Sequence, residues 1–244
     1  MWKAAPDSPC QTVSKRNPAE GSRRRRQTSM TGSDRETKRV QRHYDEEASR
    51  YDKLIGLPEK LLFGDARSRV CSQARGDVLE IAIGTGRNLP YYPQDVRIVG
   101  IELSPAMLEI ARRRAQELGR SVDLRIGDAQ ALDFPDDRFD TVVCTLSLCT
   151  IPDDRKAVAE TKRVLRPGGR LLLLEHVRSP ILTVRAIQRI LNPLSVRFQA
   201  DHLLREPLRH VEAEGLEVER LVRSKWGMVE RLSALKPRRQ ASRG

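Results

Sequence analysis

Short apolar runs alternate with helical stretches through the middle of this sequence, and no other feature constrains the fold as strongly. The runs have six to nine residues each and lie at 77–83, 96–103, 122–127, 139–146 and 169–177. Helical patterns separate them at about 105–118 and 154–165, and the second helix closes at a Pro-Gly-Gly stop. Short buried strands that alternate with helices form a parallel sheet covered on both faces. The sequence therefore predicts an α/β fold.

The flanking segments extend this pattern in both directions. A helical pattern starts at Thr37, and a second helix is expected at 58–72. Beyond residue 180 we expect a helical region, a further helix near 203–214 and two strands near 216–223 and 226–234. No internal repeat is visible, so we expect one sizeable domain with tails.

The composition excludes several classes of protein. The chain has 244 residues, of which 39% are apolar, and is long enough to bury a full core. No run approaches the ~18 apolar residues that span a bilayer, and the opening residues lack the apolar stretch of a signal peptide. Cys10, Cys71, Cys144 and Cys149 lack C-x-x-C pairs and metal-ligand spacing, so neither a zinc site nor a disulfide framework is indicated. We therefore expect a reduced, cytoplasmic protein without a metal.

The net charge of +12 is concentrated at the two ends of the chain. Residues 1–29 carry seven basic and two acidic residues, and 236–244 carry four basic residues, which leaves the rest at +3. That body lacks the clustered Lys and Arg of a nucleic-acid-binding face. We expect a disordered basic tail at 1–40, a folded domain at 41–235 and a basic tail at 236–244. The run Arg23–Arg26 is typical of a solvated tail, with an anchor for nucleic acid or an anionic surface as the alternative.

The first 29 residues show no apolar pattern and no helix-capping signal. Of the 45 basic residues in the chain, 36 are arginine, as in products of GC-rich genes, where upstream reading frames are easily mistaken for coding sequence. We therefore expect residues 1–29 to be either a mis-assigned start ahead of Met30 or a dispensable tail.

The first apolar run ends in a turn that contains two glycines. Gly84 and Gly86 follow the strand at 77–83, where the chain must turn sharply before a predicted helix. Glycine permits the positive φ angles and the close backbone approach that such a turn requires. Glu102 ends the next strand, where a carboxylate can accept hydrogen bonds from both hydroxyls of a ribose. Together these positions indicate a cofactor that carries a ribose.

Two cofactors fit this pattern. A dinucleotide fingerprint requires a third glycine at the position of Leu89. It also assigns no role to Glu80, an acid within the first strand. S-adenosylmethionine carries an ammonium and a sulfonium, and the Glu80 carboxylate can help to hold its amino-acid end. The alternative for Glu80 is a local salt bridge or a loop-capping group.

Several motifs, in order, resemble the class I S-adenosylmethionine-dependent methyltransferases, especially the branch with the ubiquinone and menaquinone C-methyltransferases. VLEIAIGTG resembles the first motif, with Ala82 where glycine is more usual, and GIELSPAMLEIAR matches the ribose-binding acid and its helix. GDAQALDFPDDRFDTVVCTLSLCTIPD and LRPGGRLLLLEH correspond to the later motifs. The resemblance covers about residues 40–180. It implies a Rossmann-like fold with a seven-stranded, mostly parallel sheet, and S-adenosyl-L-methionine as cofactor.

The resemblance also implies roles for individual residues. The positions implied to contact the cofactor are Tyr51, Glu80, Gly84, Gly86, Glu102, Leu103, Met107, Asp128, Ala129, Thr145 and Leu146. Among them Glu102 would bind the ribose and Asp128 would accept the adenine amino group, whereas Met107 is equally typical of a helix core. Tyr44 and Tyr51, about two helical turns apart, resemble a lid over the cofactor, with ordinary helix packing as the alternative. We favour the lid for Tyr51 and leave the role of Tyr44 open.

Methyl transfer is an in-line displacement, and positioning supplies most of the catalysis. A general base is needed only where the nucleophile must lose a proton. His176, at the carboxyl end of the fifth strand, is the candidate base, with a histidine bonded to nearby backbone as the alternative; His202 is the second candidate. The fourth strand lacks the Asn/Asp-Pro-Pro-aromatic stretch of enzymes that methylate nucleobase or glutamine amino groups.

The segment 181–197 carries the substrate information. It places apolar residues at helical spacing among arginines, and such a helix either lies on an anionic membrane or caps the pocket. It is also similar to the corresponding part of phosphatidylethanolamine N-methyltransferases and thiol S-methyltransferases. We expect a methyltransferase for a small apolar or lipid-like molecule (a quinone precursor or a phospholipid head group), with peripheral membrane contact through 181–197 and no nucleic acid partner. The alternative is an RNA-associated methyltransferase anchored by its arginine-rich ends.

Overall fold

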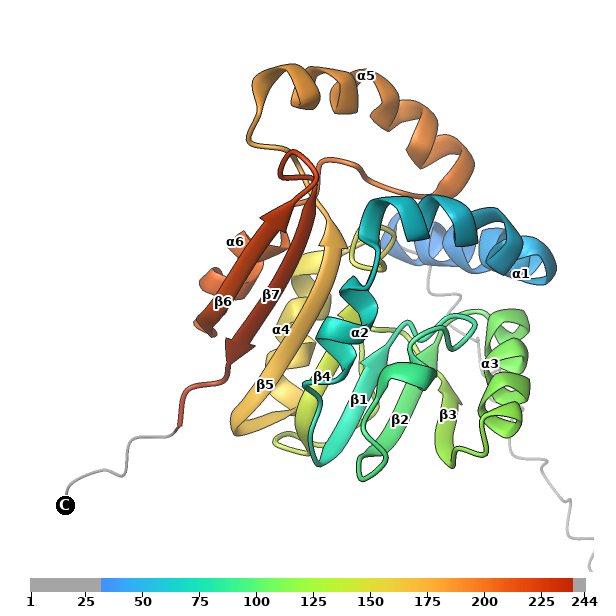
Figure 1. Cartoon of the computed structure of the whole chain (residues 1–244), viewed down its shortest axis with the longest axis vertical. Helices are drawn as coiled ribbons and strands as arrows, with labels where there is room; N and C mark the ends of the chain where they lie inside the picture. Colours follow the sequence, from blue (N-terminus) through green and yellow to red (C-terminus); the bar gives the residue numbers. More distant parts are fainter. Residues whose placement is uncertain (1–31, 239–244) are drawn as a thin grey trace, which may run out of the picture. The chain divides into compact units, whose positions relative to one another are not determined.

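The computed structural model describes residues 32–238, which form a seven-stranded sheet with helices on both faces (Figure 1). The strands are β1 (Asp77–Ile81), β2 (Arg97–Glu102), β3 (Val122–Ile126), β4 (Phe139–Thr145), β5 (Leu165–His176), β6 (Glu217–Ser224) and β7 (Val229–Leu235). Their order is β3-β2-β1-β4-β5-β7-β6, with β7 antiparallel to both of its neighbours. The predicted seven-stranded, mostly parallel sheet is confirmed.

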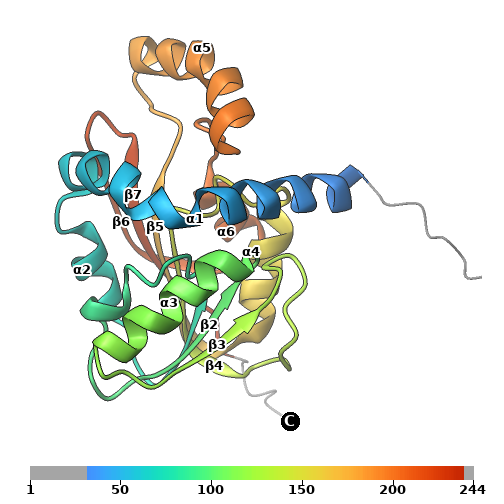
Figure 2. The same ribbon diagram turned by 90° about the vertical axis from the view of Figure 1, so that its right-hand side faces the viewer.

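The helices form two layers and a cover. Helices α2 (Ala66–Cys71) and α3 (Pro105–Glu117) pack on one face of the sheet, and α4 (Asp154–Val164) and α6 (Pro207–Ala213) pack on the other. Helices α1 (Gly32–Phe63) and α5 (Leu182–Gln199) lie beyond the edge where the parallel strands end (Figure 2). Among residues 32–238, no helix is both long enough and apolar enough to cross a bilayer.

The core consists of two apolar clusters, one on each face of the sheet. Alternate side chains of a strand point to opposite faces. Along β5, Leu171 and Leu173 join the cluster that α4 and α6 cover, whereas Leu172 and Leu174 join the cluster that α2 and α3 cover. None of the four is more than 2% exposed. A strand buried on both faces has no polar alternation, which explains the run of four leucines.

The first helix differs from the prediction at both ends. α1 begins at Gly32 and Val40 is buried, so the expectation of a disordered tail is wrong for residues 32–40. The helix predicted at 58–72 is instead the end of α1 followed by α2. Gly64, with φ +57°, takes the left-handed conformation that separates the two helices. The expectations for residues 1–31 and 239–244 lie outside the described residues.

The connection from β1 to β2 contains no α-helix, although the sequence predicted one after the Gly84–Gly86 turn. It contains only η1 (Leu89–Tyr91), a 3-10 helix of three residues. Tyr92 precedes Pro93 and is extended (φ −74°, ψ 145°), because the proline ring excludes helical backbone at the residue before it. The first loop therefore does not lead into an α-helix.

Candidate active site

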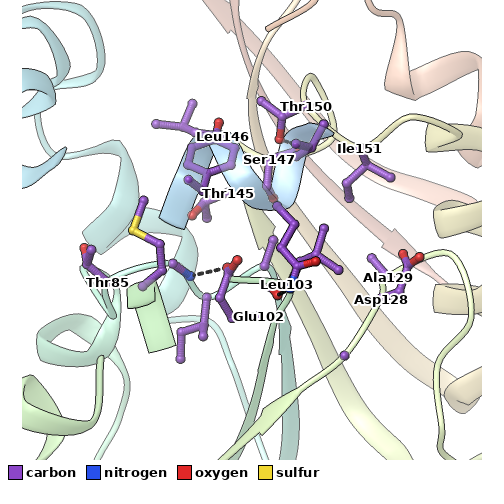
Figure 3. Close-up of a pocket in the computed structure, with 18 of the residues that line it drawn as sticks. Thr85, Glu102, Leu103, Asp128, Ala129, Thr145, Leu146, Ser147, Thr150 and Ile151 are labelled. Atoms are coloured by element: carbon purple, nitrogen blue, oxygen red, sulfur yellow. Dashed lines mark hydrogen bonds between the residues drawn. The ribbon is translucent and has the colours of Figure 1, made fainter. Parts of the chain in front are cut away.

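A cavity opens where β1, β2 and β4 end, at the point where the strand order reverses between β1 and β4. Ligands of open α/β sheets bind at this switch point. The cavity encloses about 840 Å³ including its open mouth, which is within the range of small-molecule sites. Figure 3 shows Glu102 below the loop that runs from Thr145 to Thr150, with Asp128 and Ala129 on a loop to its right.

Nine of the eleven predicted cofactor residues line this cavity. They are Tyr51, Gly84, Glu102, Leu103, Met107, Asp128, Ala129, Thr145 and Leu146. Glu80 and Gly86 are not among the lining residues. A Cβ at Gly86 would lie 3.0 Å from Leu89 Cδ1 and 3.3 Å from Ala111 Cα, so this glycine allows the loop to pack against α3. The fold thus brings most of the predicted set together, while their contacts with a cofactor stay predictions.

Glu102 holds the first loop in place from the edge of the cavity. Its carboxylate accepts hydrogen bonds from the backbone N–H groups of Gly84 and Ser104, each at 2.9 Å. Burial raises the pKa of Glu102 above its usual value, and these N–H donors oppose the rise. A carboxylate offers about four lone-pair sites. Glu102 therefore keeps acceptor capacity for hydroxyl groups of a bound molecule.

Two residues of the cavity wall have left-handed backbone without being glycine. Ala82 (φ +51°) follows β1, and Leu146 (φ +54°) follows β4. For a residue with a Cβ this conformation costs about 1–2 kcal/mol. Such strain is concentrated at functional sites, where the surrounding structure maintains it. The positive φ also explains why glycine is more usual at the position of Ala82 in the resembling family.

Glu80 belongs to a closed hydrogen-bond group beside the cavity. Its carboxylate accepts from Asn88 Nδ2 and from the Tyr92 hydroxyl, each at 2.8 Å, and the residue is 2% exposed. Burial raises the pKa of Glu80 to about 7, against the lowering effect of Tyr92 and Asn88. These contacts tie the β1–β2 connection to β1, as a loop-capping group does. A direct contact between Glu80 and a methionine end stays a prediction.

The raised pKa of Glu80 predicts that its contribution to stability falls as the pH rises. Between about pH 4.5 and 7 the folded protein keeps a proton that the unfolded chain has lost, so the free energy of unfolding decreases through this window. Glu80→Gln is neutral throughout and can still bond to Asn88 and Tyr92. We expect it to remove on the order of 2 kcal/mol of this pH dependence. Urea unfolding of both proteins at about pH 5 and pH 7.5 measures the effect, and parallel curves would contradict the shift.

A buried arginine that the sequence analysis did not single out forms part of the cavity wall. Arg67, from α2, is 9% exposed, and its guanidinium contacts the two carboxylate oxygens of Glu59 at 2.5 and 3.0 Å. Its Nη1 also donates to Asn88 Oδ1 (2.9 Å) and Thr145 Oγ1 (2.7 Å). One charge therefore joins α1, α2, the β1–β2 connection and the end of β4. No local signal marks Arg67, because its partners are distant in the sequence.

Helix α1 contributes two tyrosines to the lining of the cavity, while their role as a lid over the cofactor stays a prediction. Tyr51 lines the cavity, and so does Tyr44, whose role the sequence left open; the two rings are T-shaped with centroids 6.0 Å apart. Burial raises the pKa of both tyrosines, so both stay neutral phenols. Asp45 accepts from the N-cap hydroxyl of α3 (2.5 Å), and Asp52 accepts from Thr85 Oγ1 (2.7 Å). These contacts hold α1 against two sides of the cavity rim.

His176, the predicted base, does not line the cavity. It ends β5, and its Nε2 lies 2.8 Å from Asp201 Oδ1, just after α5, although the angle is not that of a hydrogen bond. Burial by itself lowers the pKa of His176, but the Asp201 carboxylate outweighs burial and raises it above its usual value. His202, the second candidate, does not line the cavity either. The geometry favours an ion pair that ties β5 to the end of α5.

The thiol of Cys149 completes a group that the cysteine spacing did not predict. Ligand atoms of Cys149, His176 and Asp201 lie within 4.8 Å of one another. Two ligands of one tetrahedral zinc, each about 2.0–2.1 Å from the ion, stand roughly 3.3 Å apart. The 2.8 Å contact between His176 and Asp201 is shorter than that, and burial raises the pKa of the Cys149 thiol well above its usual value. The group therefore fits a buried ion pair beside a neutral thiol better than a metal centre.

Replacing His176 with alanine tests the ion pair against the base. We expect His176→Ala to lower the free energy of unfolding by about 1–3 kcal/mol, because Asp201 loses its partner. The raised pKa means that the pair stabilises the fold below about pH 6.5 and loses this effect as the pH rises through the shifted value. The destabilisation should therefore be larger near pH 6 than near pH 9. A loss of turnover of ~100-fold with unchanged stability would instead support a general base.

Comparison with known proteins agrees with this architecture. Residues 79–173 match the family described as "Methyltransferase domain". The chain is 39% identical over 125 residues to a phosphatidylethanolamine N-methyltransferase from Cereibacter sphaeroides. The matched region makes up 49% of this chain and 62% of that protein. The chain is also 39% identical over 147 residues to a demethylmenaquinone methyltransferase from Thermus thermophilus. That match makes up 56% of this chain and 66% of the relative. The chain thus spans just under two thirds of the length of these two relatives.

Solved structures share the fold at low sequence identity. The geranyl diphosphate C-methyltransferase of Streptomyces coelicolor A3(2) superimposes with a TM-score of 0.64 over 82% of this chain and 98% of that chain, at 15% identity. The strand order and the cavity at the switch point define the class I, Rossmann-like methyltransferase fold. Residues 79–173 of this chain match the methyltransferase domain family.

Proposed function

We propose that this chain is an S-adenosylmethionine-dependent methyltransferase that acts on a small apolar or lipid-like molecule, such as a quinone precursor or a phospholipid head group. One observation carries the proposal: nine predicted cofactor residues from separate motifs line a single cavity at the switch point. The methyltransferase-domain match supports the same activity. The two relatives named for phosphatidylethanolamine and demethylmenaquinone support the substrate class.

The residues around the cavity fit this cofactor chemically. Glu102 offers a buried carboxylate to the ribose hydroxyls, and its loop partner Gly84 presents no side chain to the cavity. Asp128 supplies a second carboxylate at the cavity, suited to an adenine amino group. The apolar side chains of Leu103 and Met107 lie on the same lining and suit the flat faces of a purine.

The chain contributes binding, orientation and exclusion of water to this reaction. When bound, S-adenosylmethionine supplies an electrophilic methyl group on sulfur. Tyr44 and Tyr51 of α1 cover the cavity as neutral phenols and keep water from the reacting atoms. Positioning of this kind is worth up to ~7–11 kcal/mol. Because neither His176 nor His202 lines the cavity, we assign no proton transfer to a side chain, and an acceptor that attacks through a lone pair or an anion fits the site.

Transfer of a labelled methyl group tests the proposed function. The full chain is incubated with radiolabelled S-adenosylmethionine and a cell extract, which is then separated into lipid, aqueous small-molecule and RNA fractions. We expect label in the lipid fraction, and we expect a protein reduced to residues 32–238 to retain that activity. Label in the RNA fraction, lost on removal of the arginine-rich ends, would instead establish the RNA-associated alternative. Label in no fraction would contradict the proposal.

A further inference from the structure

Helix α5 presents its apolar side chains to the outside of the molecule. Ile187, Ile190, Leu191, Leu194 and Phe198 form one stripe at helical spacing, which we call the outer face of α5. They are 58%, 76%, 48%, 58% and 62% exposed. Residues at this spacing normally face the core of a protein. Contiguous exposed apolar patches mark surfaces that bind another apolar phase.

The inward side of the same helix is polar. Gln188 is the buried residue of α5, and its amide accepts from the N–H of Ser179 (2.8 Å) and donates to the carbonyls of Val177 (3.0 Å) and Leu203 (3.2 Å). One turn later, Asn192 Oδ1 accepts from the N–H of Leu203 (2.9 Å). Hydrogen bonds to backbone, rather than apolar packing, therefore hold α5 in place. The helix is oriented so that its apolar side remains free.

The turn between β6 and β7 adds a tryptophan near the start of α5. Trp226 is 69% exposed, and its carbonyl accepts from Ser179 Oγ at 2.7 Å. Lys225 (φ +50°) and Trp226 (φ +58°) both have left-handed backbone, which costs about 1–2 kcal/mol per residue. Exposed tryptophans are typical of proteins at a membrane–water interface.

The charges on α5 select among the surfaces that could cover it. The helix contains three arginines, Arg185, Arg189 and Arg197, and no acidic residue. Within residues 32–238, no carboxylate pairs with Arg189 or Arg197. Two copies of this helix would bring like charges together, which disfavours a symmetric dimer. An apolar stripe flanked by unpaired arginines matches a bilayer surface that contains anionic lipids.

We propose that the outer face of α5 binds the surface of an anionic lipid bilayer, with Trp226 at the interface. The apolar side chains enter the boundary between head groups and acyl chains, and the arginines contact lipid phosphates. The helix lies along the surface and does not cross it. This binding does not depend on which molecule accepts the methyl group.

Vesicle binding of paired variants tests this surface. The full chain is sedimented with phosphatidylcholine vesicles that contain about 30% phosphatidylglycerol. We expect Ile190→Glu/Leu194→Glu to bind at least about tenfold more weakly than the unchanged protein. The matched control is Leu118→Glu/Ile126→Glu, which makes the same charge change at two apolar residues, 42% and 54% exposed, on other elements. The control should bind as the unchanged protein does, and circular dichroism of both variants verifies that they fold.

A second readout reports on the surface itself. In a Trp2→Phe background Trp226 is the remaining tryptophan, and its emission should shift to the blue on vesicle addition. Equal binding by both variants would show that another part of the chain, such as the arginine-rich tail, drives association, and would overturn the proposal. A dimer in sedimentation velocity that is lost in the α5 variant, with no vesicle binding, would overturn it in favour of a second copy.

Discussion

Glu59→Leu is expected to lower the free energy of unfolding by about 3–5 kcal/mol, because it leaves the Arg67 guanidinium buried without its counter-charge. The two side chains are each 11% exposed and approach to 2.5 Å. Burial raises the pKa of Glu59, but Arg67 and Arg87 outweigh it and lower the pKa below its usual value, so the carboxylate is charged at neutral pH. Urea or thermal unfolding measures the loss.

Two further variants test whether the loss of stability comes from breaking the buried pair or from removing any glutamate of this helix. The double variant Glu59→Leu/Arg67→Met removes both charges and should recover most of the lost stability, since apolar replacements of a buried pair are often neutral. The control is Glu47→Leu, which breaks an exposed pair with Arg50 on the same helix and should cost at most about 1 kcal/mol. Equal losses for Glu59→Leu and the double variant would contradict this account.

Glu102→Ala is expected to weaken cofactor affinity at least tenfold while the fold survives. The change removes the acceptor proposed for the ribose hydroxyls, and charged hydrogen bonds are worth roughly 1.5–3 kcal/mol each. It also frees the N–H groups of Gly84 and Ser104, so the first loop loses part of its support. Calorimetric titration with S-adenosylmethionine gives the affinity, and the melting temperature shows whether the fold is retained.

The control for this variant is another glutamate of the same region. Glu109→Ala removes an exposed acid of α3, which pairs with Arg112 at the surface, and should leave cofactor affinity unchanged. Unchanged affinity in Glu102→Ala would refute the assignment of the ribose-binding acid. Tight binding of NADH by the unchanged protein would indicate a dinucleotide site instead.

The elements of the fold could be predicted because their signals are local. A strand buried on both faces needs consecutive apolar residues, so the run of four leucines predicts β5. A turn with positive φ favours glycine, so Gly84 predicts the turn after β1. The helix predicted after β1 is only the 3-10 helix η1, and Pro93 excludes its continuation through Tyr92. The early start of α1 was missed because its first turns are polar, and their contacts come from distant segments.

The sequence by itself determined the five apolar runs that form β1 to β5, the glycine turn, the acid that ends β2 and the apolar spacing of α5. The tertiary structure alone decided which groups meet. It pairs Arg67 with Glu59 and His176 with Asp201. It also places Asn88 and Tyr92 where both donate hydrogen bonds to Glu80. It also decided that the apolar side of α5 faces outward. Periodicity identifies which residues share a face, but the direction of that face depends on buried hydrogen bonds between segments that are distant in the chain.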